Sequence, residues 1–128
     1  MKNNILHRDL KLANILKNNG YLKIADFGFA RLLGEEDLAS TMLGSPLNMA
    51  PEVLNGNDYG NKADIWSIGT VFYELLFGKP PYTAGNMIDL LKNIKTKQLD
   101  FPRKINNISE VLSLNKRRAR TCCAKCWS

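Results

Sequence analysis

The segment that most constrains the fold is the longest mostly apolar stretch of the chain, IWSIGTVFYELLF at 65–77. It contains polar interruptions and is shorter than the roughly 20 residues that cross a bilayer, which argues against a transmembrane helix. Its apolar residues follow helical spacing in a wide stripe, so we expect a helix from about 63 to 77 with protein on most sides. Gly78, Pro80 and Pro81 end it.

The rest of the chain is long enough to build one domain around this helix. It has 128 residues, and its 45% hydrophobic and 23% charged content is ordinary for a globular protein. Five of its 18 basic residues lie at 115–128, whereas all of its 12 acidic residues precede them. Of the net charge of +6, +5 therefore belongs to the tail, and we expect no nucleic-acid partner.

Other elements are predicted from turn residues and spacing. Asn19 and Gly20 favour a tight hairpin turn between two short strands within 15–26. The segment 27–51 is rich in glycine and proline, has weak periodicity and exceeds the usual loop length, so we expect a functional loop. Apolar residues at helical spacing predict a second helix at about 86–95. The fold class is α+β, mostly helical with a small hairpin.

Residues suited to phosphoryl transfer flank the predicted hairpin. This chemistry needs an acceptor for the substrate hydroxyl proton, positive charge on the moving phosphoryl group and oxygen ligands for magnesium. Asp9 can supply the first and Lys11 the second. Asn14 opens the first strand and Asp26 closes the second, so antiparallel pairing returns both oxygen donors to one end. Outside such a set, an aspartate at a strand end is usually a turn former or a helix cap.

Three motifs occur in the order and spacing of the eukaryotic protein kinase signature: HRDLKLAN at 7–14, DFG at 26–28 and APE at 50–52. On these motifs the chain resembles that family. Lys11 and GSPLNMAPE at 44–52 resemble serine/threonine kinases. The runs KIADFGFARLL, STMLGSPLNMAPEVL and KADIWSIGTVFYELLFGKPPY look most like the autophagy-initiating, ULK-type kinases. The resemblance implies a partial kinase large lobe in a cytoplasmic enzyme that uses ATP and Mg²⁺ on serine or threonine of protein substrates.

The resemblance also implies roles for individual residues. Asp9 is the catalytic base, Lys11 contacts the transferred phosphate of ATP, and Asn14 and Asp26 bind magnesium. Structural roles in the family match His7, Phe27, Gly28, Glu52 and Asp64. Of these, Asp64 braces the catalytic loop, and His7 is a packed ring rather than a general base. Glu52 has no recognisable arginine partner in this sequence.

Regulation is expected in the segment between DFG and APE. Arg8 would pair with a phosphate on Thr41, since new arginine contacts can order such a loop. Ser40 is the alternative site, and an unmodified, solvated Thr41 is the simpler interpretation.

The resemblance is expected to cover residues 1–112, as the middle of a truncated large lobe, with a disordered, basic, cysteine-containing tail at 113–128. Cys123 and Cys126 form one C-x-x-C, but no second pair or histidine lies nearby to close a zinc site. KRRAR at 116–120 is compatible with a nuclear signal or a lipidated polybasic anchor.

The motifs that cover the nucleotide phosphates in the family have no counterpart before HRD. We therefore expect the chain alone to be inactive. Two functional classes remain open: part of an ATP-dependent kinase, and a non-catalytic kinase-like binding or regulatory fragment. A nonfunctional gene fragment is a third possibility.

Overall fold

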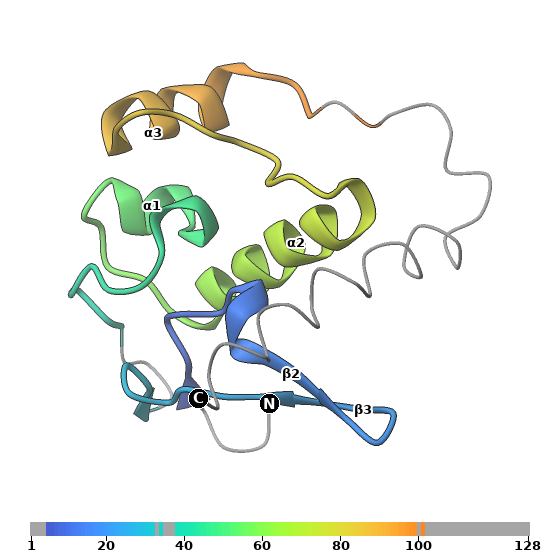
Figure 1. Ribbon diagram of the computed structural model, residues 1–128. Coiled ribbons are helices and arrows are strands. Elements are labelled where there is room, and N and C mark those ends of the chain that lie inside the picture. The colour runs from blue at the N-terminus through green and yellow to red at the C-terminus, as the bar shows by residue number, and fades with distance from the viewer. Residues whose placement is uncertain (1–4, 33, 35–37, 100, 102–128) are drawn as a thin grey trace.

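The computed structural model describes residues 5–32, 34, 38–99 and 101. In this part the chain is α+β, with two antiparallel two-stranded sheets and a central helix, α2 (Asn61–Phe77). In Figure 1 the hairpin lies on one side of α2, and α1 (Pro51–Leu54) and α3 (Met87–Thr96) lie on the other. Among the described residues no helix has the length and apolarity to cross a membrane.

The hairpin lies where the sequence predicts it. Strand β2 (Ile15–Asn18) pairs antiparallel with β3 (Tyr21–Ile24), and Ile15 stands opposite Ile24. Asn19 and Gly20 form the turn with φ of 47° and 86°. These positive angles are the ones that asparagine and glycine adopt most readily.

The segment 27–51 has more structure than its sequence predicts. Strand β4 (Arg31–Leu32) pairs antiparallel with β1 (Ile5–Leu6), and a single bridge joins Ala39 to Tyr59. A 3₁₀ turn, η2 (Pro46–Asn48), precedes α1. The prediction of one long irregular loop is therefore wrong in detail, because strands of two residues leave no periodicity to detect.

Both predicted helices are present, with ends within two residues of the expected positions. Gly78 caps α2 in the left-handed conformation at φ 72°. At α3 the Asn86 side chain accepts a hydrogen bond from the Asp89 backbone N–H at 2.8 Å, an ordinary N-cap. Ile65, Ile68 and Phe72 on α2 are about half exposed, so this helix is less enclosed than its apolar stripe predicts.

The core joins β1, the segment before α1 and the start of α2. Its buried members are Leu6, Ala39, Met49, Ala50, Val53, Tyr59 and Ala63. Leu6 is fully buried and directly precedes the HRD motif. The core therefore fixes one end of the loop that carries the candidate catalytic residues. The predicted tail at 113–128 lies outside the described residues.

Candidate active site

The loop after β1 is held on helix α2 by one buried carboxylate. Asp64 accepts hydrogen bonds from the backbone N–H groups of His7 at 2.7 Å and Arg8 at 3.0 Å. Arg8 has φ of 69°, an unfavourable conformation for a residue with a side chain. The two hydrogen bonds to Asp64 hold the backbone in place at this point.

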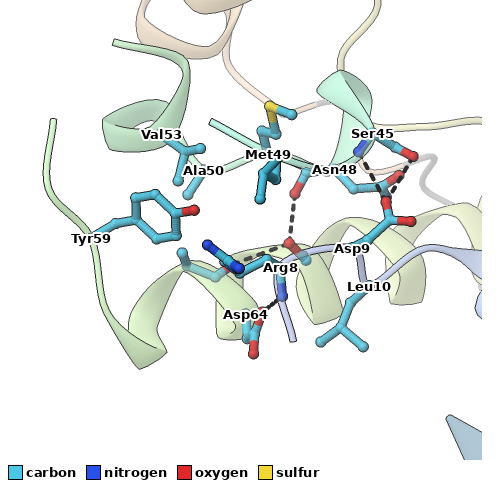
Figure 2. Close-up of a pocket in the computed structure, with 13 residues that line it drawn as sticks. Arg8, Asp9, Leu10, Ser45, Asn48, Met49, Ala50, Val53, Tyr59 and Asp64 are labelled. Carbon is cyan, nitrogen blue, oxygen red and sulfur yellow. Dashed lines mark hydrogen bonds between the residues drawn. The ribbon is translucent and has the colours of Figure 1, made fainter. Parts of the chain in front are cut away.

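Asp9 is buried with four hydrogen-bond donors around its carboxylate. Lys11 Nζ lies 2.7 Å from Oδ2 as an ion pair, and Asn14 Nδ2 donates to the same oxygen at 3.2 Å. The backbone N–H and the hydroxyl of Ser45 both donate to Oδ1 at 3.0 Å. Figure 2 shows Ser45 above the Asp9 carboxylate and the Asp64 contact beneath Arg8. Residues from distant parts of the chain therefore orient one carboxylate.

These contacts decide the protonation of Asp9. Burial raises the pKa of the carboxyl, but the hydrogen bonds from Lys11 and Ser45, the charge of Lys11 and the hydrogen bond from Asn14 together outweigh burial. The net pKa lies below the usual value for aspartate. Asp9 is therefore a carboxylate near neutral pH, the form that can accept a proton.

We expect Lys11→Met to raise the pKa of Asp9, because the substitution removes both a hydrogen bond and a positive charge. An aspartate with a lowered folded-state pKa stabilises the fold above its unfolded pKa of about 3.9, and this stability is lost as the pH falls through the folded-state pKa. Lys11→Met should flatten that acid dependence. Carbon-detected NMR titration and unfolding at several pH values measure both effects. Lys17→Met, on the exposed hairpin, is the control, and identical titrations in both variants would refute the explanation.

Asn14 and Asp26 lie at the open end of the hairpin, where Asn14 pairs with Ala25 through the backbone. The Ala25 backbone N–H donates to the Asn14 carbonyl oxygen at 2.8 Å, which continues the strand pairing by one step. The Asn14 amide nitrogen donates to the Asp9 carbonyl oxygen at 2.9 Å as well as to its carboxylate, and this assigns the amide orientation. The Asn14 amide oxygen is left as an acceptor. Among the described residues, Gly28 is the only donor to the Asp26 carboxylate, at 3.3 Å.

The donor chemistry at this end fits magnesium. One amide oxygen and one carboxylate are hard oxygen ligands, and magnesium commonly takes only one or two ligands from protein side chains. Within the described residues, no group of three or more histidine, cysteine, aspartate or glutamate side chains could hold a metal. Further ligands would have to come from water or from phosphate oxygens.

His7 contacts the DFG motif and the loop after β1 at the same time. Its Nδ1 accepts from the Asp9 backbone N–H at 3.3 Å, and its Nε2 lies 3.2 Å from the Ala25 carbonyl oxygen. These partners favour the tautomer with the proton on Nε2. The ring meets Phe27 edge to face, with the centroids 4.9 Å apart. Both nitrogens have partners, so His7 suits a structural role.

Among the described residues, the remaining predicted ones form no hydrogen bond with the Asp9 carboxylate. Arg8 Nε donates to the Phe29 carbonyl oxygen at 2.5 Å. Ser40 and Thr41 are exposed, and the Thr41 carbonyl oxygen accepts from the Tyr59 hydroxyl at 2.5 Å. Within the described part of the chain, Glu52 forms no ion pair.

Ser45 is the site residue that sequence reasoning missed. Its position after Gly44, in the segment before APE, is the only sequence signal, and its partner Asp9 lies 36 residues away. The segment is anchored to α2, because Asn48 Nδ2 donates to Thr70 Oγ1 at 2.8 Å and Ser67 Oγ donates to the Asn48 carbonyl oxygen at 2.7 Å. These buried hydrogen bonds help to hold Ser45 over Asp9.

The pocket in Figure 2 lies beneath this segment and is too small for a nucleotide. Arg8, Asp9, Ser45 and Asp64 are among the residues that line it, and its volume is about 10 Å³. A cavity of that size holds about one water molecule.

Comparison with known proteins gives consistent matches. Residues 1–127 match the family described as protein kinase domain. Serine/threonine-protein kinase ATG1b of Arabidopsis thaliana is 47% identical over 112 residues, which cover 84% of this chain and 16% of that protein. Serine/threonine-protein kinase atg1 of Dictyostelium discoideum is 44% identical over 107 residues, 80% of this chain and 16% of the relative. The chain thus spans about a sixth of these relatives, and the resemblance to autophagy-related kinases is confirmed.

Proposed function

Because the chain belongs to the protein kinase family, we propose that Asp9 accepts the hydroxyl proton of a substrate serine or threonine during phosphoryl transfer from ATP. The observation that carries this proposal is the Asp9 carboxylate, which is held ionised by Lys11, Asn14 and Ser45. A general base must be deprotonated and fixed within reach of the proton that it removes. Asp9 meets the first condition through its lowered pKa and the second through its four donors.

Lys11 and the hairpin end complete the proposed site. Lys11 Nζ is paired with Asp9 but its side chain is 32% exposed, so the ammonium can also meet a phosphoryl oxygen. Asn14 and Asp26 would hold magnesium, which when bound neutralises phosphate charge. The amide nitrogen of Asn14 donates to Asp9, so its amide oxygen is the atom that would bind the cation. The same side chain would therefore couple the position of the base to that of the metal.

The test is phosphate transfer by the complete protein that contains these residues. We expect Asp9→Asn to lower kcat on serine or threonine peptides by at least about 100-fold, the usual loss when a general base is removed. Asp26→Asn should lower kcat as well, because it removes the charge of a proposed magnesium ligand. Lys23→Met, on the exposed hairpin, should leave kcat unchanged. Undiminished transfer by Asp9→Asn would exclude Asp9 as the base.

We also propose that the 128-residue chain alone does not catalyse phosphoryl transfer. Its sequence contains no G-x-G-x-x-G motif to cover the phosphates. Purified chain incubated with Mg-ATP and a serine peptide should give no phosphopeptide. Transfer that disappears in Asp26→Ala would overturn this part of the proposal. A cytoplasmic location stays a prediction.

Regulation by Thr41 stays part of the proposal. Thr41 is exposed and accessible to a modifying enzyme, and its backbone is fixed by Tyr59. The Arg8 guanidinium donates to Phe29 through Nε alone among the described residues. Its terminal nitrogens can therefore pair with a phosphate. Ser40 is the alternative acceptor.

A non-catalytic binding role is the second candidate, favoured by apolar exposure on the hairpin. Tyr21 and Leu22 are 75% and 71% exposed, and Leu16 and Ile24 are also open. By the strand register, Leu16 and Tyr21 lie on one face of the hairpin and Leu22 and Ile24 lie on the other. Exposed apolar surface of this kind can mark an interaction site. Under this alternative the chain folds and binds a protein partner with no stabilisation by Mg-ATP. Nucleotide-dependent stabilisation would favour the catalytic role.

A further inference from the structure

The sequence contains two Asn-Gly pairs, Asn19-Gly20 and Asn55-Gly56. Asparagine is a chemically labile residue, and a following glycine has no side chain to shield it from attack by the next backbone nitrogen. All four residues are exposed, and no described atom lies within 4 Å of the Cβ position of either glycine. Both glycines have positive φ, 86° for Gly20 and 73° for Gly56. Exposure and crowding therefore do not distinguish the two pairs.

Hydrogen bonds restrain the second pair, at the end of α1. The Gly56 N–H donates to the Val53 carbonyl oxygen at 3.1 Å, and the Asn55 N–H donates to the Pro51 carbonyl oxygen at 3.0 Å. The side-chain amide of Asn55 also donates to Asn57 Oδ1 at 3.3 Å. Attack by the Gly56 nitrogen has to break the first of these bonds, and rotation of the Asn55 side chain has to break the last.

The first pair carries no such restraint. Asn19 and Gly20 form the two-residue turn between β2 and β3, which extends away from the labelled helices in Figure 1. Among the described residues, neither the Asn19 side chain nor the Gly20 N–H has a hydrogen-bond partner. The Asn19 side chain is therefore free to rotate, and the Gly20 nitrogen is free to react.

We propose that Asn19 is a site of spontaneous deamidation in the folded protein, and that the fold protects Asn55. The Gly20 backbone nitrogen loses its proton to water and forms a bond with Asn19 Cγ. The bond from Cγ to the side-chain nitrogen breaks, and that nitrogen takes up a proton and leaves as ammonia. Water then opens the cyclic imide at either carbonyl carbon, which gives aspartate or isoaspartate. Water is the only co-reactant, and the proposal does not depend on the proposed catalytic function.

Isoaspartate should alter the turn more than aspartate does. It routes the main chain through the former side-chain carbon and so adds one atom to the backbone, which a two-residue turn with a fixed geometry accommodates poorly. The turn sets the register of the four cross-strand pairs of the hairpin, whose other end carries Asn14 and Asp26. Formation of isoaspartate at position 19 should therefore loosen the hairpin that holds both proposed magnesium ligands.

Ageing of the full chain in mildly alkaline buffer tests the proposal, with peptide mapping by mass spectrometry to follow the loss of each side-chain amide. We expect Asn19 to react at least about fivefold faster than Asn55, the factor that corresponds to one hydrogen bond that must open first. In urea both pairs lose their structure, so the two rates should converge. Equal rates in the folded chain would overturn the proposal. A ratio as large in urea as in water would also overturn it, because the local sequence and not the fold would then set the difference.

Asn19→Asp is the matched control for the effect on the hairpin, because it introduces the same charge without the added backbone atom. The isoaspartate form, separated by chromatography, should show hydrogen exchange at the β3 amides at least about fivefold faster than Asn19→Asp. Exchange in Asn19→Asp should stay near that of the unmodified chain. Identical exchange in the isoaspartate form and in Asn19→Asp would show that the modification does not loosen the hairpin, and this part of the proposal would be wrong.

Discussion

Gly44→Ala is expected to destabilise the fold by about 2–5 kcal/mol, the sum of a left-handed backbone penalty and an overpacking penalty. Gly44 has φ of 106°, which disfavours any residue with a side chain. A Cβ there would lie 2.2 Å from the Arg8 carbonyl oxygen and 3.4 Å from the Asp9 Cα. Both of these neighbours are backbone, so neither can move aside by changing rotamer. The segment that carries Ser45 must therefore shift away from the catalytic loop.

Gly56→Ala separates the two causes. Gly56 also has a positive φ, 73°, but no atom lies within 4 Å of its Cβ position. The free energy of unfolding of this variant should fall only by the penalty for a left-handed backbone, about 1–2 kcal/mol. Urea unfolding of both variants gives the comparison, and the NMR titration of Asp9 adds a local readout. Gly44→Ala should raise the pKa of Asp9 by withdrawing Ser45, whereas Gly56→Ala should leave it unchanged. Equal losses of stability would show that the contact with Arg8 is unimportant.

The surroundings of Gly44 show which features the sequence predicts and which it does not. The hairpin and both long helices follow from signals local in sequence, namely the Asn19-Gly20 turn and helical spacing. The β1–β4 pair and the Ala39–Tyr59 bridge join residues about 20 or more positions apart through very short pairings, for which no local pattern exists. The close approach of Gly44 to Arg8 is likewise visible only in three dimensions.

The candidate site also contains residues that the sequence predicts and one residue, Ser45, that it does not. Asp9, Lys11, Asn14 and Asp26 stand in recognisable motifs, and their residue types already suggest phosphoryl transfer. Ser45 carries no comparable signal, because a serine in a loop usually serves as a turn former or is solvated. Its importance comes from two hydrogen bonds to a carboxylate far away in the chain. Motifs thus predict which groups are present, and the fold decides which of them orient Asp9.

Asp64→Ala is the second substitution with a large expected effect. Asp64 is buried, and its two oxygens accept the backbone N–H groups of His7 and Arg8. Alanine would leave the buried His7 N–H and the partly buried Arg8 N–H without this partner, at a cost of about 1–3 kcal/mol each. We therefore expect a loss of about 2–6 kcal/mol in the free energy of unfolding, measured by urea denaturation. The catalytic loop should also lose its fixed conformation, because Arg8 is held at a positive φ.

Asp64→Asn distinguishes the loss of hydrogen-bond acceptors from the loss of side-chain volume. The asparagine oxygen can still accept one N–H group, but its amide nitrogen would face the other donor, so the loss should lie between those of wild type and Asp64→Ala. Asp58→Ala, which removes an exposed aspartate, should change stability by no more than about 0.5 kcal/mol. Hydrogen exchange at the His7 and Arg8 amides gives a site-specific check, since both should exchange faster in Asp64→Ala than in Asp58→Ala. Unchanged exchange in Asp64→Ala would mean that Leu6 and the core hold the loop without the carboxylate.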